Sequence, residues 1–424
     1  HVYFNIHFDH PFEIDLLQDG IIRKGSFAAS TKSLLAVLNF GQLRKRKLMA
    51  KIGLSNVSYE GAKFNLEAEN PEWDFDAIRR RARVKWQQTL SKIELEGGSD
   101  QQKVIFYTAL YHCLLAPYVF SDKDGRYRGI DQRIYRSHRD PAYTVFSLWD
   151  TYRALNPLLT IIDPPKNELY IRTLLEKYKK GGLLPKWELS GNYTGTMIGS
   201  HSLSVICDAF MKGDKDFDLD LAIEAMKKSL HYREHDDFLF PNERVRRKLN
   251  PKAKKYNDEM GYIPCDLENE SVSKALEYAY NDWCLYRVLD QCGRSEEAKV
   301  YKERSSRYRQ YFDQNTGFMR GLDKNKNWKT PFDPTFSKHR KDEYCEGNAW
   351  QWTFFVPHDI QGLSELMGGV VNMTHKMDQL FTISSAIAGE HVSNDISGLI
   401  GQYAHGNEPS HHIAHMYSLL GQPF

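Results

Sequence analysis

The sequence predicts a mainly α-helical chain with a smaller β-domain at its N-terminal end. Apolar and polar residues alternate over residues 2–8, which is the period of a half-buried strand. From Asp76 the apolar residues recur at helical spacing, and beyond Gly97 and Gly98 the composition is helical almost throughout. A chain of 424 residues is long enough to bury a core in each of two domains.

The β-domain is expected over residues 1–68. Further β-prone stretches follow the first strand at residues 33–40 and 47–57, and Gly and Asn separate them. We expect these strands to form part of a β-sandwich. Residues 69–98 are expected to be connector helices, because apolar residues from Ile78 to Leu90 share one helix face and Arg and Lys occupy the outer side.

Residues 99–424 are expected to form stacked pairs of antiparallel helices. Apolar residues recur at helical spacing over residues 104–116, 271–291 and 297–312, and loops rich in Gly, Pro and Asp separate such stretches. Paired helices can close into an (α/α) barrel whose loops face one cavity, or stack as an open solenoid. The sequence contains no repeat of fixed period, which favours the barrel.

Charge and hydropathy argue against two kinds of partner. The chain has 57 Lys and Arg residues against 55 Asp and Glu residues, and a net charge of +2 does not suit nucleic acid. We interpret the scattered basic clusters at residues 44–47, 79–81, 246–248 and 252–255 as solvated faces. No membrane span is expected, because every apolar run falls short of the ~20 residues that a span needs.

The six cysteines lie mostly within apolar helical patterns and form no CxxC pair. We therefore expect buried free thiols instead of a disulfide framework or a zinc site.

Several tryptophans lie next to carboxylates in the sequence. Trp149 precedes Asp150, Trp187 precedes Glu188, and aromatic residues make up 13% of the chain. A sugar needs both groups, because its C–H face stacks on an aromatic ring and its hydroxyls bind charged partners. The pairing favours a carbohydrate ligand, and the alternative is that these tryptophans only fill the core.

Residues 344–352 place the carboxylate of Glu346 beside Gly, Asn and aromatic residues at the start of an apolar helix. Burial there would raise the pKa of Glu346 and keep it protonated, as a catalytic acid requires. The alternative is a glutamate at a helix N-terminus, where the macrodipole would lower the pKa. The residues alone do not decide between the two.

Residues 405–415 contain four histidines and Glu408. The HExxH pattern of zinc hydrolases is absent, so a transition metal is the weaker interpretation. The oxygen donors of Asn407 and Glu408 are better suited to a hard cation such as calcium.

An ordered series of motifs resembles glycoside hydrolase family 92 over roughly residues 35–424. The motifs lie at residues 120–129, 144–153, 261–264, 270–280, 346–350, 356–359 and 406–412. The resemblance implies a β-sandwich over residues 1–68, connector helices over 69–98 and an (α/α)6 barrel catalytic domain over 99–424, with the sandwich and the barrel both incomplete in this chain. It implies a calcium-dependent exo-α-mannosidase that removes terminal α-mannose from glycans, N-glycans among them, with inversion. Export to the periplasm or outside the cell is expected from such substrates, although the chain begins without a leader.

The resemblance also implies roles for individual residues. Glu346 matches the general acid, and Trp149 with Asp150 matches the pair that holds the terminal mannose. His405, Asn407 and Glu408 match a loop that contacts sugar and calcium, with Asn407 and Glu408 as metal ligands. Arg153 and Trp187, and more weakly Glu188 and His201, are expected near the pocket.

One departure from the family pattern concerns the residue that activates water. The family carries this carboxylate downstream of a Gly-Gln-Pro segment, and the sequence ends at residues 421–424 with Gly-Gln-Pro-Phe. We therefore expect the general base beyond Phe424. The alternatives are a non-catalytic glycan-binding protein, an inactive fragment without the base, or a helical-barrel glycosidase of another specificity.

Overall fold

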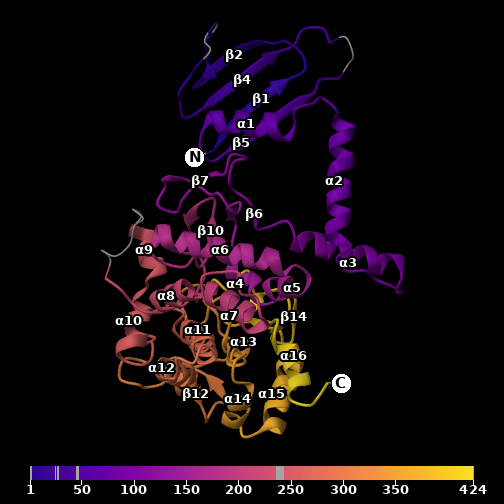
Figure 1. The fold of residues 1–424 in the computed structure, drawn as a ribbon. Helices are drawn as coiled ribbons and strands as arrows, with labels where there is room; N and C mark the ends of the chain where they lie inside the picture. The colour runs from indigo at the N-terminus through magenta and orange to yellow at the C-terminus, as the bar shows by residue number, and fades with distance from the viewer. Residues whose placement is uncertain (1, 24, 26–27, 44–46, 235–242, 424) are drawn as a thin grey trace. The chain divides into compact units, whose positions relative to one another are not determined.

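The computed structural model describes residues 2–23, 25, 28–43, 47–234 and 243–423. The chain divides into two compact units, whose elements are labelled in Figure 1. The first unit comprises His1–Tyr111, Val119–Arg128 and Ile134–Ala142, and the second comprises His112–Tyr118, Gly129–Arg133 and Tyr143–Phe424. Residues 44–46 of the first predicted basic cluster lie outside the described residues.

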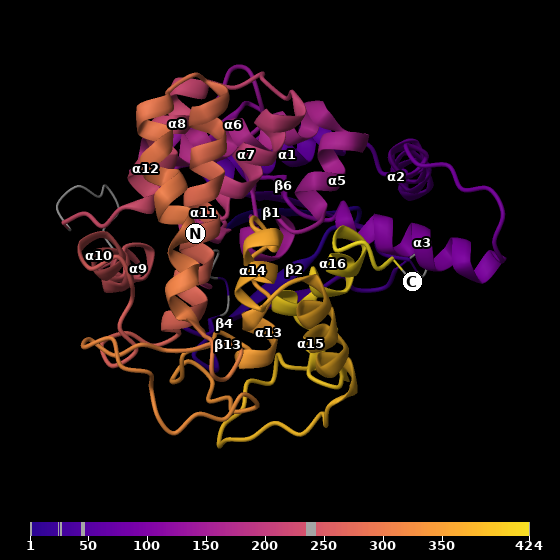
Figure 2. The same cartoon turned by 90° about the horizontal axis from the view of Figure 1, so that it is seen from below.

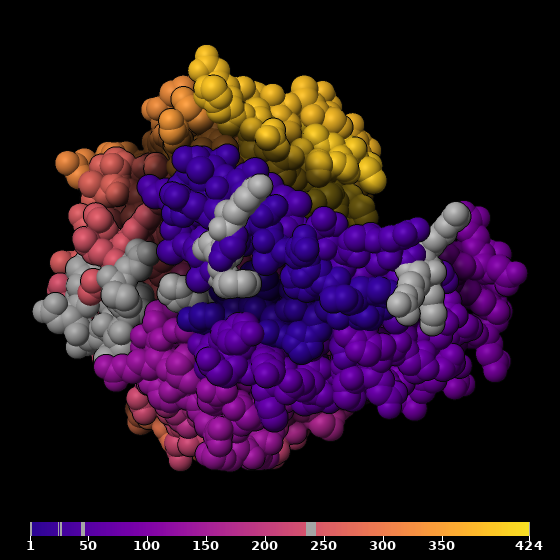
Figure 3. Space-filling view, turned by 90° about the horizontal axis from the view of Figure 1, so that it is seen from above, coloured from indigo at the N-terminus to yellow at the C-terminus, as the bar shows by residue number. Residues whose placement is uncertain are grey.

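The first unit begins with antiparallel strands. Its elements are β1 (Tyr3–Phe8), β2 (Glu13–Gln18), β3 (Ile21–Arg23), β4 (Leu34–Asn39), β5 (Ala50–Ser55), α1 (Tyr59–Glu69), α2 (Phe75–Leu90), α3 (Asp100–Cys113), β7 (Arg126–Arg128) and β8 (Ile134–Arg136). Strand β1 pairs with β5, and β2 pairs with both β3 and β4. In the space-filling view of Figure 3, seen from above, the residues near the N-terminus that form these strands are indigo. The strands predicted at residues 2–8, 33–40 and 47–57 are confirmed as β1, β4 and β5, whereas β2, β3 and α1 were not predicted.

Helix α1 covers the face of β1 that the alternating pattern assigned to solvent. Asn5 is buried on that face, whereas Phe4 on the opposite face is 60% exposed and Ile6 is 38% exposed. Gly53 on β5 permits the close approach of α1, because a Cβ at this position would lie 2.2 Å from the carbonyl oxygen of Ala62. The strand was predicted correctly, but its buried face was wrong because a helix packs on the polar side.

Helix α2 confirms the helix predicted from Asp76. Its N-cap is Asp74, whose carboxylate accepts a hydrogen bond from the Ala77 amide at 2.8 Å. None of the residues of α2 is buried, which agrees with the charged outer surface expected of a connector. Helix α3 begins four residues before the predicted stretch at residues 104–116 and ends at Cys113.

The second unit is built mainly from helices. They are α4 (Leu148–Thr151), α5 (Leu155–Ile162), α6 (Pro164–Gly181), α7 (Ser202–Lys212), α8 (Leu219–Leu230), α9 (Glu243–Leu249), α10 (Lys252–Glu259), α11 (Ser271–Gln291), α12 (Ser295–Ser305), α13 (Ala349–Thr353), α14 (Ile360–Leu366), α15 (Val370–Thr382) and α16 (Ile413–Leu419), with the 3-10 turns η2 (Ser306–Tyr311) and η3 (Glu408–Ser410). Short strands connect them: β6 (Tyr118–Val119), β9 (Tyr143–Thr144), β10 (Glu188–Leu189), β11 (Asn192–Tyr193), β12 (Phe312–Asp313), β13 (Phe318–Met319), β14 (Leu399–Ile400) and β15 (Tyr403–Ala404).

Helix α11 is central to the packing of the second unit. It coincides with the predicted stretch at residues 271–291 and packs against α7, α8 and α12. Seen from below, α14, α15 and α16 lie on the side away from α8 and α12 (Figure 2). The stretch predicted at residues 297–312 divides into α12 and η2, because the chain tightens to a 3-10 turn at Ser306.

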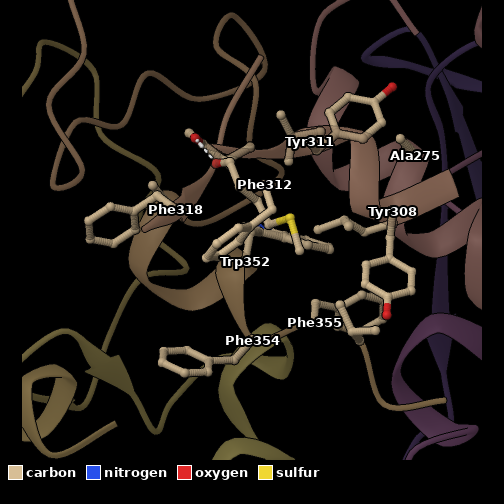
Figure 4. Packing of buried hydrophobic residues seen from close by; sticks show 14 of the residues in the cluster. Ala275, Tyr308, Tyr311, Phe312, Phe318, Trp352, Phe354 and Phe355 are labelled. Atoms are coloured by element: carbon tan, nitrogen blue, oxygen red, sulfur yellow. Dashed lines mark hydrogen bonds between the residues drawn. The ribbon is translucent and has the colours of Figure 1, made fainter. Parts of the chain in front are cut away.

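Two large hydrophobic clusters form the core of the second unit. One joins α6, α7 and α8 to the C-terminal half of α11. The other is rich in aromatic residues and includes Trp149; Figure 4 shows Tyr308 and Tyr311 from η2 packed near Trp352 and Phe355. Tyr344, Cys345 and Ala349 belong to this second cluster, so the segment that carries the predicted acid is packed into the core on both sides of Glu346.

The helix-rich second unit and the small sheets of the first agree with a mainly α chain that has β structure at its start. The β-sandwich, the (α/α)6 barrel and the domain borders stay predictions. None of the described helices is both long and apolar enough to cross a membrane. The cysteines are free thiols, and Cys207, Cys284 and Cys345 are buried.

Candidate active site

One pocket in the second unit collects most of the predicted site residues. Its volume is about 630 Å³, and its lining comes from the start of α4, the β10–β11 hairpin with the loop after it, the loop before α13, and residues 394–408. The predicted residues in this lining are Trp149, Asp150, Trp187, Glu346, Asn407 and Glu408. The lining does not include Arg153 or His405.

The indole of Trp149 is held from behind by a buried carboxylate. Its Nε1 donates a hydrogen bond to Oε1 of Glu277 at 2.7 Å, and Oε2 of Glu277 lies 2.6 Å from Nε2 of His201. Glu277 is fully buried and His201 is almost so. Gly199 leaves the space for this pair, because a Cβ at this position would lie 2.0 Å from Oε2 of Glu277.

Arg153 lies behind Trp149 and belongs to the same buried group. Its Nε donates to the carbonyl oxygen of Trp149 at 3.0 Å, and its guanidinium carbon lies 4.8 Å from the centre of the indole ring. A guanidinium nitrogen also lies 3.8 Å from Glu277. These contacts support the ring of Trp149, whereas the sequence had suggested a position near the sugar.

Asp150 follows Trp149 on α4 and faces the pocket. The Ser147 hydroxyl donates a hydrogen bond to its carboxylate. Burial and, to a lesser extent, the negative charge of Glu408 raise the pKa of Asp150 to about 6. The carboxylate is therefore ionised at neutral pH and can accept hydrogen bonds from hydroxyl groups.

Glu346 lies just outside helix α13 and not within its first turn. Asn348 is the N-cap of α13, and its side chain forms a capping box with Gln351. Glu346 itself has a left-handed φ of 47°, a strained conformation that tends to occur at functional sites. Burial raises the pKa of Glu346 to about 7, with further contributions from the charges of Asp395 and Glu408. This direction contradicts the alternative in which a macrodipole lowers the pKa.

The loop at residues 405–412 reaches Glu346 through Asn407. The Asn407 side-chain amide donates to the carbonyl oxygen of Glu346 at 2.8 Å, which leaves its amide oxygen free of this bond. His411 and His412 each lie within hydrogen-bond distance of a backbone carbonyl oxygen, that of His405 at 3.1 Å and that of Phe354 at 2.8 Å. These histidines therefore bond to the backbone, which does not support the weaker interpretation of a transition-metal site.

The oxygen donors of this loop suit a hard cation. Asn407 and Glu408 offer an amide and a carboxylate oxygen on the same lining as Asp395 and Asp150. Mutual repulsion of the carboxylates contributes to the raised pKa values of Asp150 and Glu346, so negative charge accumulates at this point. Within the described part of the chain, no group of three or more His, Cys, Asp and Glu side chains could hold a metal ion. A cation here would need amide, carbonyl or water oxygens as well.

Trp187 and Glu188 have different environments although they are neighbours. Trp187 lines the pocket. Glu188 is fully buried, lies 3.1 Å from the ammonium of Lys177 and accepts hydrogen bonds from Thr144 and the Gly191 amide. Glu188 therefore fixes the β10–β11 hairpin on which Trp187 is carried.

Sequence reasoning missed part of the lining. Asn394, Asp395 and Ser397 contribute polar groups from a loop. Their only signal is a polar run next to Gly398, which is typical of any surface loop. Met197 also lines the pocket with a left-handed φ of 62°, a feature that the sequence does not reveal.

Comparison with known proteins gives consistent matches. The model of the glycosyl hydrolase family 92 catalytic domain matches residues 61–424. An uncharacterized secreted glycosidase of Arthroderma benhamiae is 28% identical over 406 residues, which are 89% of this chain and 45% of that protein.

Solved structures match over nearly the whole chain. A family GH92 α-mannosidase from Bacteroides thetaiotaomicron, in complex with mannoimidazole, has a TM-score of 0.89 and 34% identity, covering 100% of this chain and 55% of that one. A family GH92 inverting mannosidase from the same species has a TM-score of 0.82 and 31% identity, covering 98% of this chain and 56% of that one. The chain therefore spans about half the length of these proteins.

Proposed function

This chain belongs to glycosyl hydrolase family 92, and we propose that it acts as an exo-α-mannosidase that removes terminal α-linked mannose from glycans. The observation that carries the proposal is the common pocket of Glu346, Trp149 and Asp150. The two similar mannosidase structures support the choice of sugar. At about 630 Å³ the pocket has the size of a small-ligand site, a class that ranges over roughly 300–1,000 Å³.

In this proposal Glu346 is the general acid. Hydrolysis of a glycosidic bond requires a proton on the leaving oxygen, and a carboxyl group with a pKa near 7 still carries that proton at neutral pH. Half-burial of Glu346 supports this role, because a solvated glutamate would be ionised. The Asn407 bond to the Glu346 backbone fixes the strained residue in place.

The terminal sugar would be held by an aromatic contact and by hydroxyl contacts. Trp149 is only 2% exposed, so the part of its indole that reaches the pocket, fixed by Glu277, offers a small apolar surface to a sugar. Asp150, Glu408 and Asp395 offer acceptors for its hydroxyl groups.

We further propose that calcium assists the reaction and that Asn407 and Glu408 hold it. Support comes from the oxygen donors of these residues and from the concentration of carboxylates around them. When bound, calcium would hold sugar hydroxyls and favour a distorted ring close to the oxocarbenium-like transition state. Chelation with EDTA should abolish activity and lower the melting temperature, and added calcium should restore both. Full activity after chelation would refute this part.

Inversion at the anomeric carbon is proposed from the similar inverting mannosidase. The first product should be β-mannose, which NMR can observe before mutarotation. An α-product would refute the proposal. Export is proposed as well, because the curated relative is named a secreted glycosidase.

The acid assignment is tested by replacing Glu346 with glutamine. Glu346→Gln should lower kcat/KM on a mannose disaccharide by about 10²–10⁴-fold and should affect a dinitrophenyl mannoside much less, because that leaving group needs no proton. Glu365→Gln, an exposed glutamate outside the pocket, is the matched control and should retain activity. Equal loss on both substrates would refute the role of Glu346, and mannose binding without turnover would favour a glycan-binding protein.

A further inference from the structure

A second pocket meets the candidate active site at Glu346. Its volume is about 270 Å³, and it shares Thr196, Met197 and Glu346 with the first pocket. It contains neither Trp149 nor Asp150. A general acid lies between the sugar that it releases and the group that leaves, because it protonates the oxygen that joins them. If the first pocket holds the terminal sugar, the second pocket is on the leaving-group side.

The second pocket is lined by an excess of positive charge. Its cations are Lys186, Arg247, Lys248, Lys274 and Arg340, and its carboxylates are Glu268, Glu270 and Glu346. Lys274 is neutralised within the pocket, since its ammonium lies 2.7 Å from Glu268 and 3.6 Å from Glu270. Arg247 pairs with Glu243 at 3.2 Å on the exposed surface. For Lys186, Lys248 and Arg340, no carboxylate of the described residues lies within salt-bridge distance.

Among these cations, Lys186 is the buried one whose ammonium has too few hydrogen-bond acceptors. It is only 8% exposed, and its ammonium makes one long hydrogen bond, to the carbonyl oxygen of Lys248 at 3.4 Å. An ammonium has three donors, and a buried cation without partners is unfavourable. Burial and, to a lesser extent, the charge of Lys274 lower the pKa of Lys186 to about 8, so the group is still cationic at neutral pH.

Lys254 is a buried lysine of the same unit whose ammonium does have hydrogen-bond acceptors, and it serves as a comparison for Lys186. It is 3% exposed, and its ammonium donates to the carbonyl oxygens of Ser229 at 2.6 Å and Leu249 at 3.0 Å. Lys254 has these backbone acceptors and does not line the pocket. Lys186 has only the long bond to Lys248 and does line the pocket, so a ligand bound there can supply the acceptors that it needs.

The backbone around the pocket is held in unusual conformations. Met197, Glu270, Arg340 and Glu346 all line it with left-handed φ values of 62°, 55°, 57° and 47°. Such residues concentrate where a fold positions groups for a ligand. Gly195 contributes a further left-handed position on the same lining, where a Cβ would lie 2.6 Å from Cβ of Lys248.

We propose that this second pocket binds an oxyanion, a phosphate or carboxylate group carried by the leaving part of the substrate, with Lys186 and Arg340 as its principal partners. This inference rests on the proposed glycosidase function, because the leaving-group side is defined by Glu346 as the acid. The oxyanion would supply acceptors to the Lys186 ammonium and a charge to the Arg340 guanidinium.

The experiment has two arms that fail independently. In the first, inorganic phosphate is titrated into the chain by calorimetry. Lys186→Met and Arg340→Gln should each weaken binding by about tenfold or more, as loss of a charge-assisted hydrogen bond predicts. Arg81→Gln, which removes a cation of α2 in the first unit, is the control for net charge and should bind as the parent does. Arg340 is exposed, so Arg340→Gln stays informative if Lys186→Met does not fold. Absence of phosphate binding by the parent chain would overturn the proposal.

In the second arm, kcat/KM is compared for two mannose disaccharides that differ only by a phosphate on the reducing sugar. The parent should favour the phosphorylated substrate, and both variants should reduce this preference by about tenfold. Phosphate binding without any such preference would indicate a site for free phosphate and would overturn the leaving-group role. If neither disaccharide is cleaved while phosphate still binds, the proposed glycosidase function fails, and the leaving-group role fails with it.

Discussion

Replacing Glu277 should loosen the ring of Trp149 without altering any atom that lines the pocket. Glu277 is fully buried on α11 and joins three groups: the Trp149 indole at 2.7 Å, the His201 ring at 2.6 Å and the Arg153 guanidinium at 3.8 Å. Two variants separate its hydrogen bonds from its charge. Glu277→Leu removes both, and Glu277→Gln removes only the charge.

The expected magnitudes follow from these contacts. A hydrogen bond to a charged group contributes about 1.5–3 kcal/mol, and removing one partner of a buried ion pair costs about 3–5 kcal/mol. The two ranges are not added, because the hydrogen bonds and the ion pair share one carboxylate. We therefore expect Glu277→Leu to lower the free energy of unfolding by about 4 kcal/mol. For Glu277→Gln we expect about 1–2 kcal/mol. The glutamine oxygen can accept from Trp149, and its amide can donate to His201 if the His201 proton moves to Nδ1, which lies 3.2 Å from Ser204 Oγ.

Urea denaturation and steady-state kinetics on a mannoside measure the two effects. Glu277→Leu should raise KM by about tenfold or more, because Trp149 is no longer held in the lining of the pocket, whereas Glu277→Gln should raise KM only slightly. Asp282→Asn is the matched control: Asp282 is buried on the same helix and lies 2.9 Å from Arg304, outside the lining of the pocket. It should lower stability and leave KM unchanged. Equal effects of the leucine and glutamine variants on KM, or an equal rise in the control, would refute the reasoning.

Further predictions concern the protonation of Glu346 and His358 and the close packing at Gly199. With Glu346 as the acid, its raised pKa means that activity is present below pH 7 and that kcat/KM falls as pH rises through about 7; a profile unchanged up to pH 9 would contradict this. Burial lowers the pKa of His358 to about 4, so the folded state favours the neutral imidazole. The contribution of this group to the free energy of unfolding is fully present above pH 6.5 and is lost as pH falls toward 4. At pH 5 this loss is about 2 kcal/mol. His358→Gln, which can still donate to the Ser305 carbonyl oxygen, should reduce the difference between urea midpoints at pH 7.5 and pH 5, and an unchanged difference would exclude His358 as the cause. Gly199→Ala places a Cβ 2.0 Å from Glu277 Oε2 at a φ of +70° and should lower the melting temperature and raise KM together; a melting temperature equal to that of the parent would show that the site can relax.

Local patterns predicted much of the secondary structure. The α11 boundaries followed from apolar residues at helical spacing, because most of that helix is buried and the pattern is strong. Strands β2 and β3 were missed, since their short runs carry little periodicity. The buried face of β1 was wrong for a tertiary reason: α1 and Gly53 bring a helix onto the polar side.

The candidate site was predictable where neighbouring residues act together. Trp149 with Asp150, and Asn407 with Glu408, were identified as adjacent pairs, and the structure places both pairs on one pocket. The resemblance implied a position near the pocket for Arg153, yet its side chain contacts the ring and the carbonyl oxygen of Trp149 and is not part of the lining. Asp395 was missed because its loop has no distinctive pattern.

The sequence by itself determined which residue types could perform the chemistry: aromatic rings beside carboxylates, an acid on an apolar background, and oxygen donors in one loop. Only the tertiary structure decided how they act. Trp149 and Glu277 are 128 positions apart, and Glu346 and Asn407 are 61 apart, so their contacts depend on packing that local periodicity does not encode. The raised pKa of Glu346 has the same origin, because desolvation and nearby charge exist only once distant segments have come together.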